Sequence, residues 1–146
     1  MTLRATSFAK ANFVLEKPFT SINLESQDRH LRRKLLTLED GTEILVDFAK
    51  TAKLEDGDCL VLDDGRLVQV AAREEDLLEV RAANQVQLAR LAWHIGNRHL
   101  EAQIERTRIL IRPDHVIAAM LEGQGAIVKQ VREKFSPENG AYAHAH

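Results

Sequence analysis

Histidine is the residue type in this sequence with the most potential for chemistry. The chain has six histidines, and all but His30 lie in its second half. Neutral imidazole binds nickel, copper and zinc ions through a ring nitrogen. The candidate metal ligands are therefore four histidines of the second half, His99, His115, His144 and His146, while the fifth, His94, has a structural explanation.

The local sequence suggests a position for three of these histidines. His94 falls in the last turn of an expected helix, where an imidazolium ion interacts favourably with the helix dipole, so a structural role is sufficient for it. His99 follows Gly96, which we expect to end that helix, and it should project from a loop. His115 follows a predicted N-cap, Asp114. The helix N-terminus favours a neutral imidazole that is able to coordinate, although an ordinary surface role fits the spacing equally well.

The last two histidines form a His-X-His pattern at the end of the chain. His144 and His146 come after Ser136-Pro137, where the composition changes to glycine, alanine and polar residues. This composition predicts a flexible tail over residues 137–146. Two imidazoles on such a tail could bind a metal ion, or the pattern could be incidental.

Other kinds of site have little support. Gly123-Gln124-Gly125 lacks the third glycine and the following helix of a dinucleotide-binding loop. The single cysteine, Cys59, excludes an internal disulfide and a cysteine-based zinc ribbon, and its apolar neighbours predict a buried structural thiol. The basic cluster at residues 29–34 is expected to be a solvated edge strand rather than a phosphate site.

The composition indicates a globular protein. With 146 residues, 45% of them hydrophobic and 29% charged, the chain can form the core of one medium or two small domains. The net charge of -2 provides no basic field for nucleic acid or a membrane surface. The N-terminus lacks the apolar stretch of a signal peptide, and no apolar run is long enough to span a membrane. We expect a cytoplasmic protein that binds neither nucleic acid nor membranes.

Residues 1–73 have the pattern of a small all-β domain. Asp-Gly occurs at residues 40–41, 56–57 and 64–65, and this dipeptide supplies the positive φ angles of hairpin turns. Two hairpins are predicted, together with two weaker strand candidates. The hairpins pair Leu35–Leu38 with Ile44–Phe48 and Cys59–Leu62 with Leu67–Val70, and the weaker strands are Phe13–Leu15 and Ser21–Leu24.

Residues 74–136 alternate between strand and helix patterns. Asn84 is the predicted N-cap of a first helix, with Gln87 at its third position, and Pro113-Asp114 begins a second helix. The expected order is a strand at 77–80, a helix to Gly96, one or two strands within 102–111, a helix to Gly123 and a strand at 127–135. This βαββαβ order predicts a ferredoxin-like domain, so the chain as a whole is expected to be an α+β protein with a short histidine-containing tail.

The apolar residues of the two helices fall on identifiable faces. In the first helix, one face carries Val86, Ala89 and Trp93, with Leu88, Ala92 and Ile95 beside it. In the second helix, the residues expected to face inward are Val116, Ile117, Met120 and Leu121.

Several motifs of the second half resemble those of a known family. The stretch His94-Ile95-Gly96-Asn97-Arg98-His99, followed by Gln103-Ile104, Asp114-His115-Val116, Met120-Leu121 and Gly140-Ala141-Tyr142-Ala143, is similar to the urease accessory proteins called UreE. The resemblance spans the chain, and the order of the Gly-Asn-Arg-His and Asp-His-Val motifs makes it specific. It implies a homodimeric metallochaperone, not an enzyme, that binds Ni²⁺ and supplies it to apo-urease. Its implied partners are the urease apoprotein and its accessory proteins, including a GTPase, and Zn²⁺ or Cu²⁺ can take the place of nickel.

The resemblance also implies roles for individual histidines. His99 matches the histidine that binds metal at the two-fold interface between second domains, and His115 matches a histidine of a peripheral site. His144 and His146 occupy the place of a longer histidine-rich tail, which implies a small nickel capacity. Pro113 stands where some members have a further histidine. The implied division is a partner-docking domain at 1–73, a metal-binding and dimerisation domain at 74–136, and the tail at 137–146.

Two other functions remain open on the residues alone. A metal-dependent enzyme would use His99 and His115 as ligands, but it would need a carboxylate base and an enclosed pocket, and no His-Glu-X-X-His motif is present. A protein-interaction module would carry these histidines incidentally.

Overall fold

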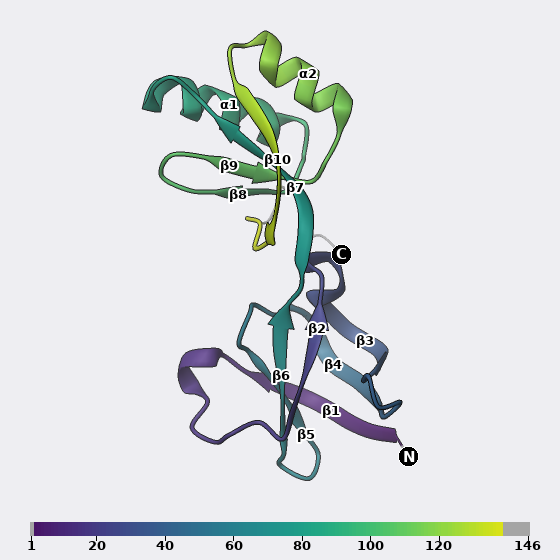
Figure 1. The fold of residues 1–146 in the computed structure, drawn as a ribbon. Helices are drawn as coiled ribbons and strands as arrows, with labels where there is room; N and C mark the ends of the chain where they lie inside the picture. The colour runs from purple at the N-terminus through teal and green to yellow at the C-terminus, as the bar shows by residue number, and fades with distance from the viewer. Residues whose placement is uncertain (1, 139–146) are drawn as a thin grey trace. The chain divides into compact units, whose positions relative to one another are not determined.

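The computed structural model describes residues 2–138. The chain divides into two compact units, Met1–Arg73 and Glu74–His146, and each has a sheet of its own (Figure 1). The α+β class predicted from the sequence is confirmed. Within residues 2–138, no helix is long and apolar enough to cross a membrane.

The first unit is a six-stranded sheet with the order β2-β6-β5-β1-β4-β3. Short 3-10 turns at Ala11–Phe13 and Ser26–Arg29 interrupt the strands. The strands are β1 (Thr2–Ala9), β2 (Thr20–Leu24), β3 (His30–Thr37), β4 (Glu43–Lys53), β5 (Cys59–Leu62) and β6 (Leu67–Ala72).

Both predicted hairpins are confirmed. In the first, Leu36 pairs with Ile44 between antiparallel β3 and β4, and in the second, Leu60 pairs with Val68 between β5 and β6. The glycines of all three Asp-Gly dipeptides have φ angles between 88° and 93°. Turn chemistry therefore positions the strands as the sequence predicts.

Two features of this unit differ from the sequence predictions. β1 was not predicted, although it lies inside the sheet, parallel to β4 and antiparallel to β5. Ala5 is its only fully buried residue, so the strand has no apolar alternation to reveal it. The strand predicted at Phe13–Leu15 is wrong: a 3-10 turn ends at Phe13, and Leu15 is 96% exposed.

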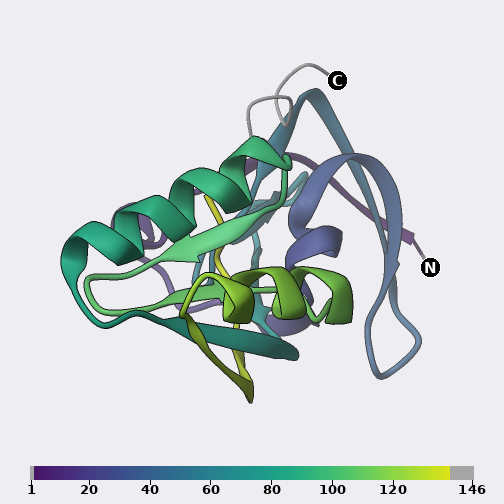
Figure 2. The ribbon, with the colours of Figure 1, turned by 90° about the horizontal axis from the view of Figure 1, so that it is seen from above.

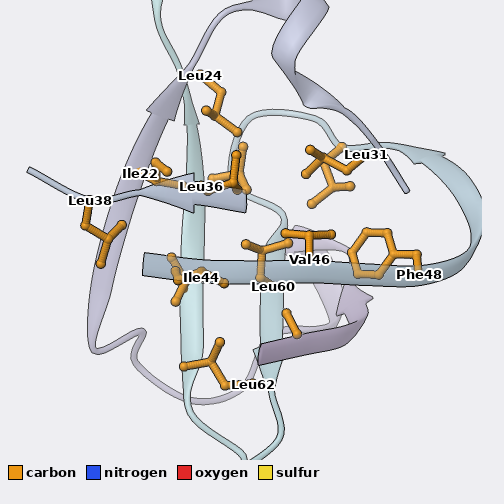
Figure 3. Packing of buried hydrophobic residues seen from close by; sticks show 14 residues of the cluster. Ile22, Leu24, Leu31, Leu36, Leu38, Ile44, Val46, Phe48, Leu60 and Leu62 are labelled. Carbon is orange, nitrogen blue, oxygen red and sulfur yellow. The ribbon is translucent and has the colours of Figure 1, made fainter. Parts of the chain in front are cut away.

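The core of the first unit is aliphatic. Side chains from β2, β3, β4 and β5 point toward one another, with Leu36, Ile44 and Leu60 among them (Figure 3). The basic cluster is only partly solvated, which corrects the prediction for residues 29–34. Residues 32–34 are exposed on edge strand β3, whereas Arg29 is fully buried, and its Nη1 donates to the Leu54 carbonyl at 3.3 Å.

The second unit is a four-stranded antiparallel sheet with the order β10-β7-β9-β8. Buried side chains from both helices and from the strands form one cluster, so the two helices cover the same face of the sheet (Figure 2). The elements are β7 (Glu74–Arg81), α1 (Gln85–Asn97), β8 (Ala102–Ile104), β9 (Ile109–Ile111), α2 (His115–Gly123) and β10 (Ile127–Lys134).

The inward face of α2 differs in part from the prediction, and α1 buries one of the two apolar faces that its sequence offers. α1 buries Leu88, Leu91 and Ile95, while Val86 and Trp93 are 62% and 65% exposed. α2 buries Ile117 and Leu121 and half-buries Met120, but Val116, which the pattern placed inside, is 62% exposed. Each helix therefore keeps apolar surface outside the core.

The opposite face of this sheet carries an ion-pair network around Arg108. Its guanidinium donates to Glu79, Glu105 and Glu133 at 2.7–3.0 Å. Hydrogen bonds from Arg81 and then from Arg108 lower the pKa of Glu79, and the Arg108 hydrogen bonds lower the pKa of Glu133. The network ties the β8–β9 turn to β7 and β10.

Candidate metal site

His99 terminates α1 in a left-handed backbone conformation. Its φ of 60° is the only positive φ of a non-glycine residue within residues 2–138. The His99 amide donates to the Gly96 carbonyl at 3.0 Å, and the Leu100 amide donates to the Ile95 carbonyl at 3.3 Å. These two hydrogen bonds make a Schellman motif in which His99 occupies the position usually held by glycine.

The helix end therefore differs from the prediction. Gly96 does not stop α1 but lies within it, and the helix continues to Asn97. The expectation that His99 leaves the helix in a loop is nevertheless confirmed, and its side chain is exposed. Residues with a Cβ are uncommon in this conformation, and histidine is one of the few types that adopt it, so His99 is a position to examine for function.

His115 is the first residue of α2, and it is also exposed. The predicted N-cap is confirmed, because Asp114 Oδ1 accepts from the amides of Val116 and Ile117 at 2.9 and 3.1 Å. The cap fixes the first turn of the helix and with it the backbone that carries His115.

The β8–β9 hairpin brings the segments of His99 and His115 to one end of the sheet. Ala102 and Ile111 are paired at that end, so His99 lies three residues before the pair and His115 four residues after it. An ion pair of 2.7 Å between Glu101 and Arg112 joins the same two segments.

The chain that follows β10 also reaches this end of the sheet. The Ser136 amide donates to Gln103 Oε1 at 2.8 Å, and the Glu138 amide donates to the Ala102 carbonyl at 2.7 Å. We call residues 135–138 the tail root. It attaches the end of the described chain to edge strand β8, three residues after His99.

The remaining histidines of the second half are His94, His144 and His146. His94 lies in the last turn of α1, as predicted, with its ring edge-on to Trp93 at a centroid distance of 5.1 Å. His144 and His146, the predicted tail ligands, lie outside the described residues. Between residues 2 and 138, no three His, Cys, Asp or Glu side chains are grouped so that they could hold a metal ion.

Cys59 is a structural thiol, as predicted. Its side chain is fully buried in the first unit, and its thiol donates to the Gly57 carbonyl at 3.9 Å. Burial, with a smaller contribution from Asp58, raises the pKa of the Cys59 thiol and disfavours the thiolate that binds metal.

The apolar face of α1 that carries Val86, Ala89 and Trp93 was named from the sequence, but its exposure was not predicted: it forms an exposed stripe on the helix that ends in the His99 cap. Val86 and Trp93 are seven residues apart, which places them on one face two turns from each other. Both side chains are more than 60% exposed. With exposed Ala89 between them, they give this face of α1 an apolar surface that lies outside the core.

Comparisons with known proteins identify the family of this chain. The family model described as "UreE urease accessory protein, C-terminal domain" matches residues 75–146, and the model of the corresponding N-terminal domain matches residues 5–73. The chain belongs to the UreE family. Proteins of this family are accessory proteins and not enzymes, as the sequence predicted for this chain.

Individual UreE proteins match over nearly the whole chain. Urease accessory protein UreE 1 of Brucella suis is 53% identical over 98% of this chain and 89% of its own length. The UreE of Rhizobium rhizogenes is 49% identical over 98% of this chain and 85% of its own, and that of Agrobacterium fabrum is 48% identical over 99% and 89%. The resemblance noted in the sequence motifs therefore extends to both units.

Proposed function

We propose that this protein is a metallochaperone that binds Ni²⁺ and delivers it to apo-urease while the urease active site is assembled. The observation that carries the proposal is His99, an exposed imidazole held in a left-handed helix cap that favours glycine. Membership of the UreE family supports urease as the recipient, because the relatives are named urease accessory proteins.

The nickel site forms between two copies of the chain. One imidazole per chain is a weak site, whereas a two-fold axis brings two copies of His99 together. The exposed stripe of Val86 and Trp93 on the same helix supports dimerisation through the second unit. The order of strands in this unit, β10-β7-β9-β8 and all antiparallel, supports a ferredoxin-like dimerisation domain at 74–136.

His115, His144 and His146 are auxiliary ligands in this proposal. The position of His115 at the start of α2, at the same end of the β8–β9 hairpin as His99, supports its inclusion. The hydrogen bond that attaches the tail root to Ala102 supports the inclusion of His144 and His146 as ligands. His144 is six residues after Glu138, and an extended chain of that length spans about 20 Å.

A site built from imidazole suits a carrier. Neutral nitrogen ligands bind Ni²⁺ and, without thiolates, still allow its release, and they also accept Zn²⁺ or Cu²⁺. Ligands on a tail can leave one by one as the metal is transferred. The nickel ion is therefore the cargo of the protein, and it is released at the end of each delivery.

The first unit, residues 1–73, is the proposed docking domain for partner proteins. We assign to it contacts with the urease apoprotein and its accessory proteins, including the accessory GTPase, and we place the protein in the cytoplasm with urease. Membership of an accessory family supports such partners, since the activity of an accessory protein depends on the complex that it serves.

Removal of the His99 imidazole tests the proposal. His99→Ala should abolish the tightest Ni²⁺ binding in isothermal titration with NiCl₂ while the circular dichroism spectrum stays unchanged, because an exposed side chain contributes little packing. His30→Ala, in the first unit, is the matched control and should bind nickel as the unaltered protein does. Tight nickel binding by His99→Ala at the original stoichiometry would refute the site.

A further inference from the structure

Arg112 lies where three segments of the second unit meet. It directly follows β9, and its Nη1 donates to Glu101 Oε1 at 2.7 Å. Its guanidinium also lies over the ring of Phe135, 5.1 Å from the ring centroid. Glu101 is two residues after His99, Phe135 begins the tail root, and His115 is three residues after Arg112 itself.

Both contacts of Arg112 are stronger than ordinary surface contacts. The side chains of Arg112 and Glu101 are 28% and 27% exposed, whereas those of the Arg132–Asp76 pair in the same unit are 59% and 79% exposed. Partial burial reduces screening of the ion pair by water. The Phe135 ring is fully buried, and a planar guanidinium can lie on such a ring while it donates hydrogen bonds at its edge.

These contacts act on backbone that requires support. The left-handed conformation of His99 persists only if its surroundings hold it in place. Glu101 fixes the chain two residues beyond His99, and Phe135 fixes the start of the tail root, whose amides then reach β8. Removal of the guanidinium would release both segments.

We propose that Arg112 is a positioning residue of the metal site, which holds the His99 loop and the tail root at one end of the second unit. The inference rests on the proposed function, in which His99 and the tail histidines bind Ni²⁺. Arg112 itself contributes no metal ligand. It acts through Glu101 and Phe135.

Amide hydrogen exchange in the full-length, metal-free protein tests the positioning directly. Arg112→Gln should accelerate exchange of the Leu100 amide, which donates to Ile95, and of the Glu138 amide, which donates to Ala102. Arg112→Lys retains the charge opposite Glu101 and should restore protection at Leu100 in part. Arg108→Gln removes an ion-pair network at the opposite end of the β8–β9 hairpin, so it controls for general destabilisation and should leave both amides protected.

Titration with NiCl₂ tests the consequence for the site. Arg112→Gln should weaken nickel binding by about tenfold, the size of effect that outer-shell partners of metal ligands produce. Glu101→Gln removes the same ion pair from the other side and provides a second variant if Arg112→Gln does not fold. Arg108→Gln should bind nickel with unchanged affinity.

The outcomes separate this inference from the proposed function. If His99→Ala abolishes tight binding but Arg112→Gln and Glu101→Gln change neither exchange nor affinity, the role of Arg112 is refuted and the site stands. Equal changes in amide exchange and nickel affinity in Arg112→Gln and Arg108→Gln would also refute the positioning role of Arg112. If His99→Ala leaves nickel binding intact, the proposed site fails, whatever the exchange rates show.

Discussion

His99 presents an exposed imidazole from a left-handed backbone conformation that is unfavourable for residues with a Cβ. A residue with a Cβ loses roughly 1 kcal/mol or more in the left-handed region, and glycine would occupy the same cap without that cost. The sequence contains a glycine three residues earlier, at Gly96, yet α1 runs through it. Under the proposed function, the imidazole at this cap serves as a metal ligand.

Replacement of His99 by glycine should stabilise the metal-free protein. We expect the free energy of unfolding to rise by about 0.5–1 kcal/mol, because relief of the left-handed strain exceeds the extra entropy of glycine in the unfolded chain. Urea denaturation of the metal-free protein measures this change, and the same variant should lose tight Ni²⁺ binding. His99→Ala, which keeps a Cβ, is the control and should not gain stability. A lower free energy of unfolding in His99→Gly would contradict the backbone strain that we infer at His99.

The sequence alone predicted the loop position of His99 but not its backbone geometry. A glycine near the end of a helical pattern is the usual left-handed residue, so Gly96 was the natural prediction for the helix end. The structure places the left-handed residue at His99, and Leu100 then packs partly buried against the core. Tertiary packing determines which residue reverses the chain at the helix end, because the next apolar side chain, Leu100, must reach the core.

At the scale of elements, local signals predicted where helices begin better than which face they bury. The N-cap of α1 is confirmed, because Asn84 accepts from the Gln87 amide at 2.8 Å and Gln87 Oε1 accepts from the Ala83 amide at 2.9 Å. The α1 sequence has two apolar faces, and periodicity cannot tell which one the sheet covers. β1 was missed for a related reason, since its burial comes from its neighbours in the sheet and not from its own pattern.

The Arg108 network should make stability depend on acid pH. The folded pKa values of Glu79 and Glu133 lie below their unfolded values, so the stabilisation is present above about pH 4.3 and is lost as the pH falls through the lowered values. Arg108→Gln should lower the free energy of unfolding by about 1 kcal/mol at pH 7, a modest value because Glu105 and Glu133 are about one-third exposed. Urea denaturation at pH 7, 5 and 3 should show this difference shrinking toward pH 3.

Arg132→Gln is the control for the Arg108 network. Its partner Asp76 is largely exposed, so this substitution should change stability by less than about 0.5 kcal/mol at any of these pH values. If the loss of unfolding free energy in Arg108→Gln stayed constant from pH 7 to pH 3, the carboxylates of the network would not contribute to stability through their charge.

At the scale of the whole molecule, the proposed dimer depends on the exposed α1 stripe of Val86 and Trp93. Trp93→Glu should convert a dimer into a monomer in sedimentation velocity, because the substitution removes a large apolar contact and places like charges near a two-fold axis. Ile127→Glu alters an equally exposed apolar residue at the start of β10 and should leave the dimer intact. A protein that is monomeric before substitution, or a Trp93→Glu variant that remains dimeric, would contradict this interface.

The tail should add to nickel binding without being essential to it. Truncation after Tyr142 removes His144 and His146 but keeps the tail root and His99. We expect a several-fold weaker affinity and fewer bound ions in a titration with NiCl₂, while the site at His99 persists. Changing both histidines to alanine in the full-length chain is the control for the loss of length and should give the same result. Undiminished affinity and stoichiometry would mean that the tail supplies no ligand.

The burial of Cys59 has a practical consequence for labelling. It is the single thiol of the chain, fully enclosed in the first unit, and the second unit has none. An alkylating reagent can reach it only while the first unit is open, so the modification rate measures how often that unit opens, independently of the second. A cysteine introduced at an exposed site such as Lys129 would react long before Cys59 does. The protein can therefore carry a single fluorophore on its second unit without removal of its own cysteine.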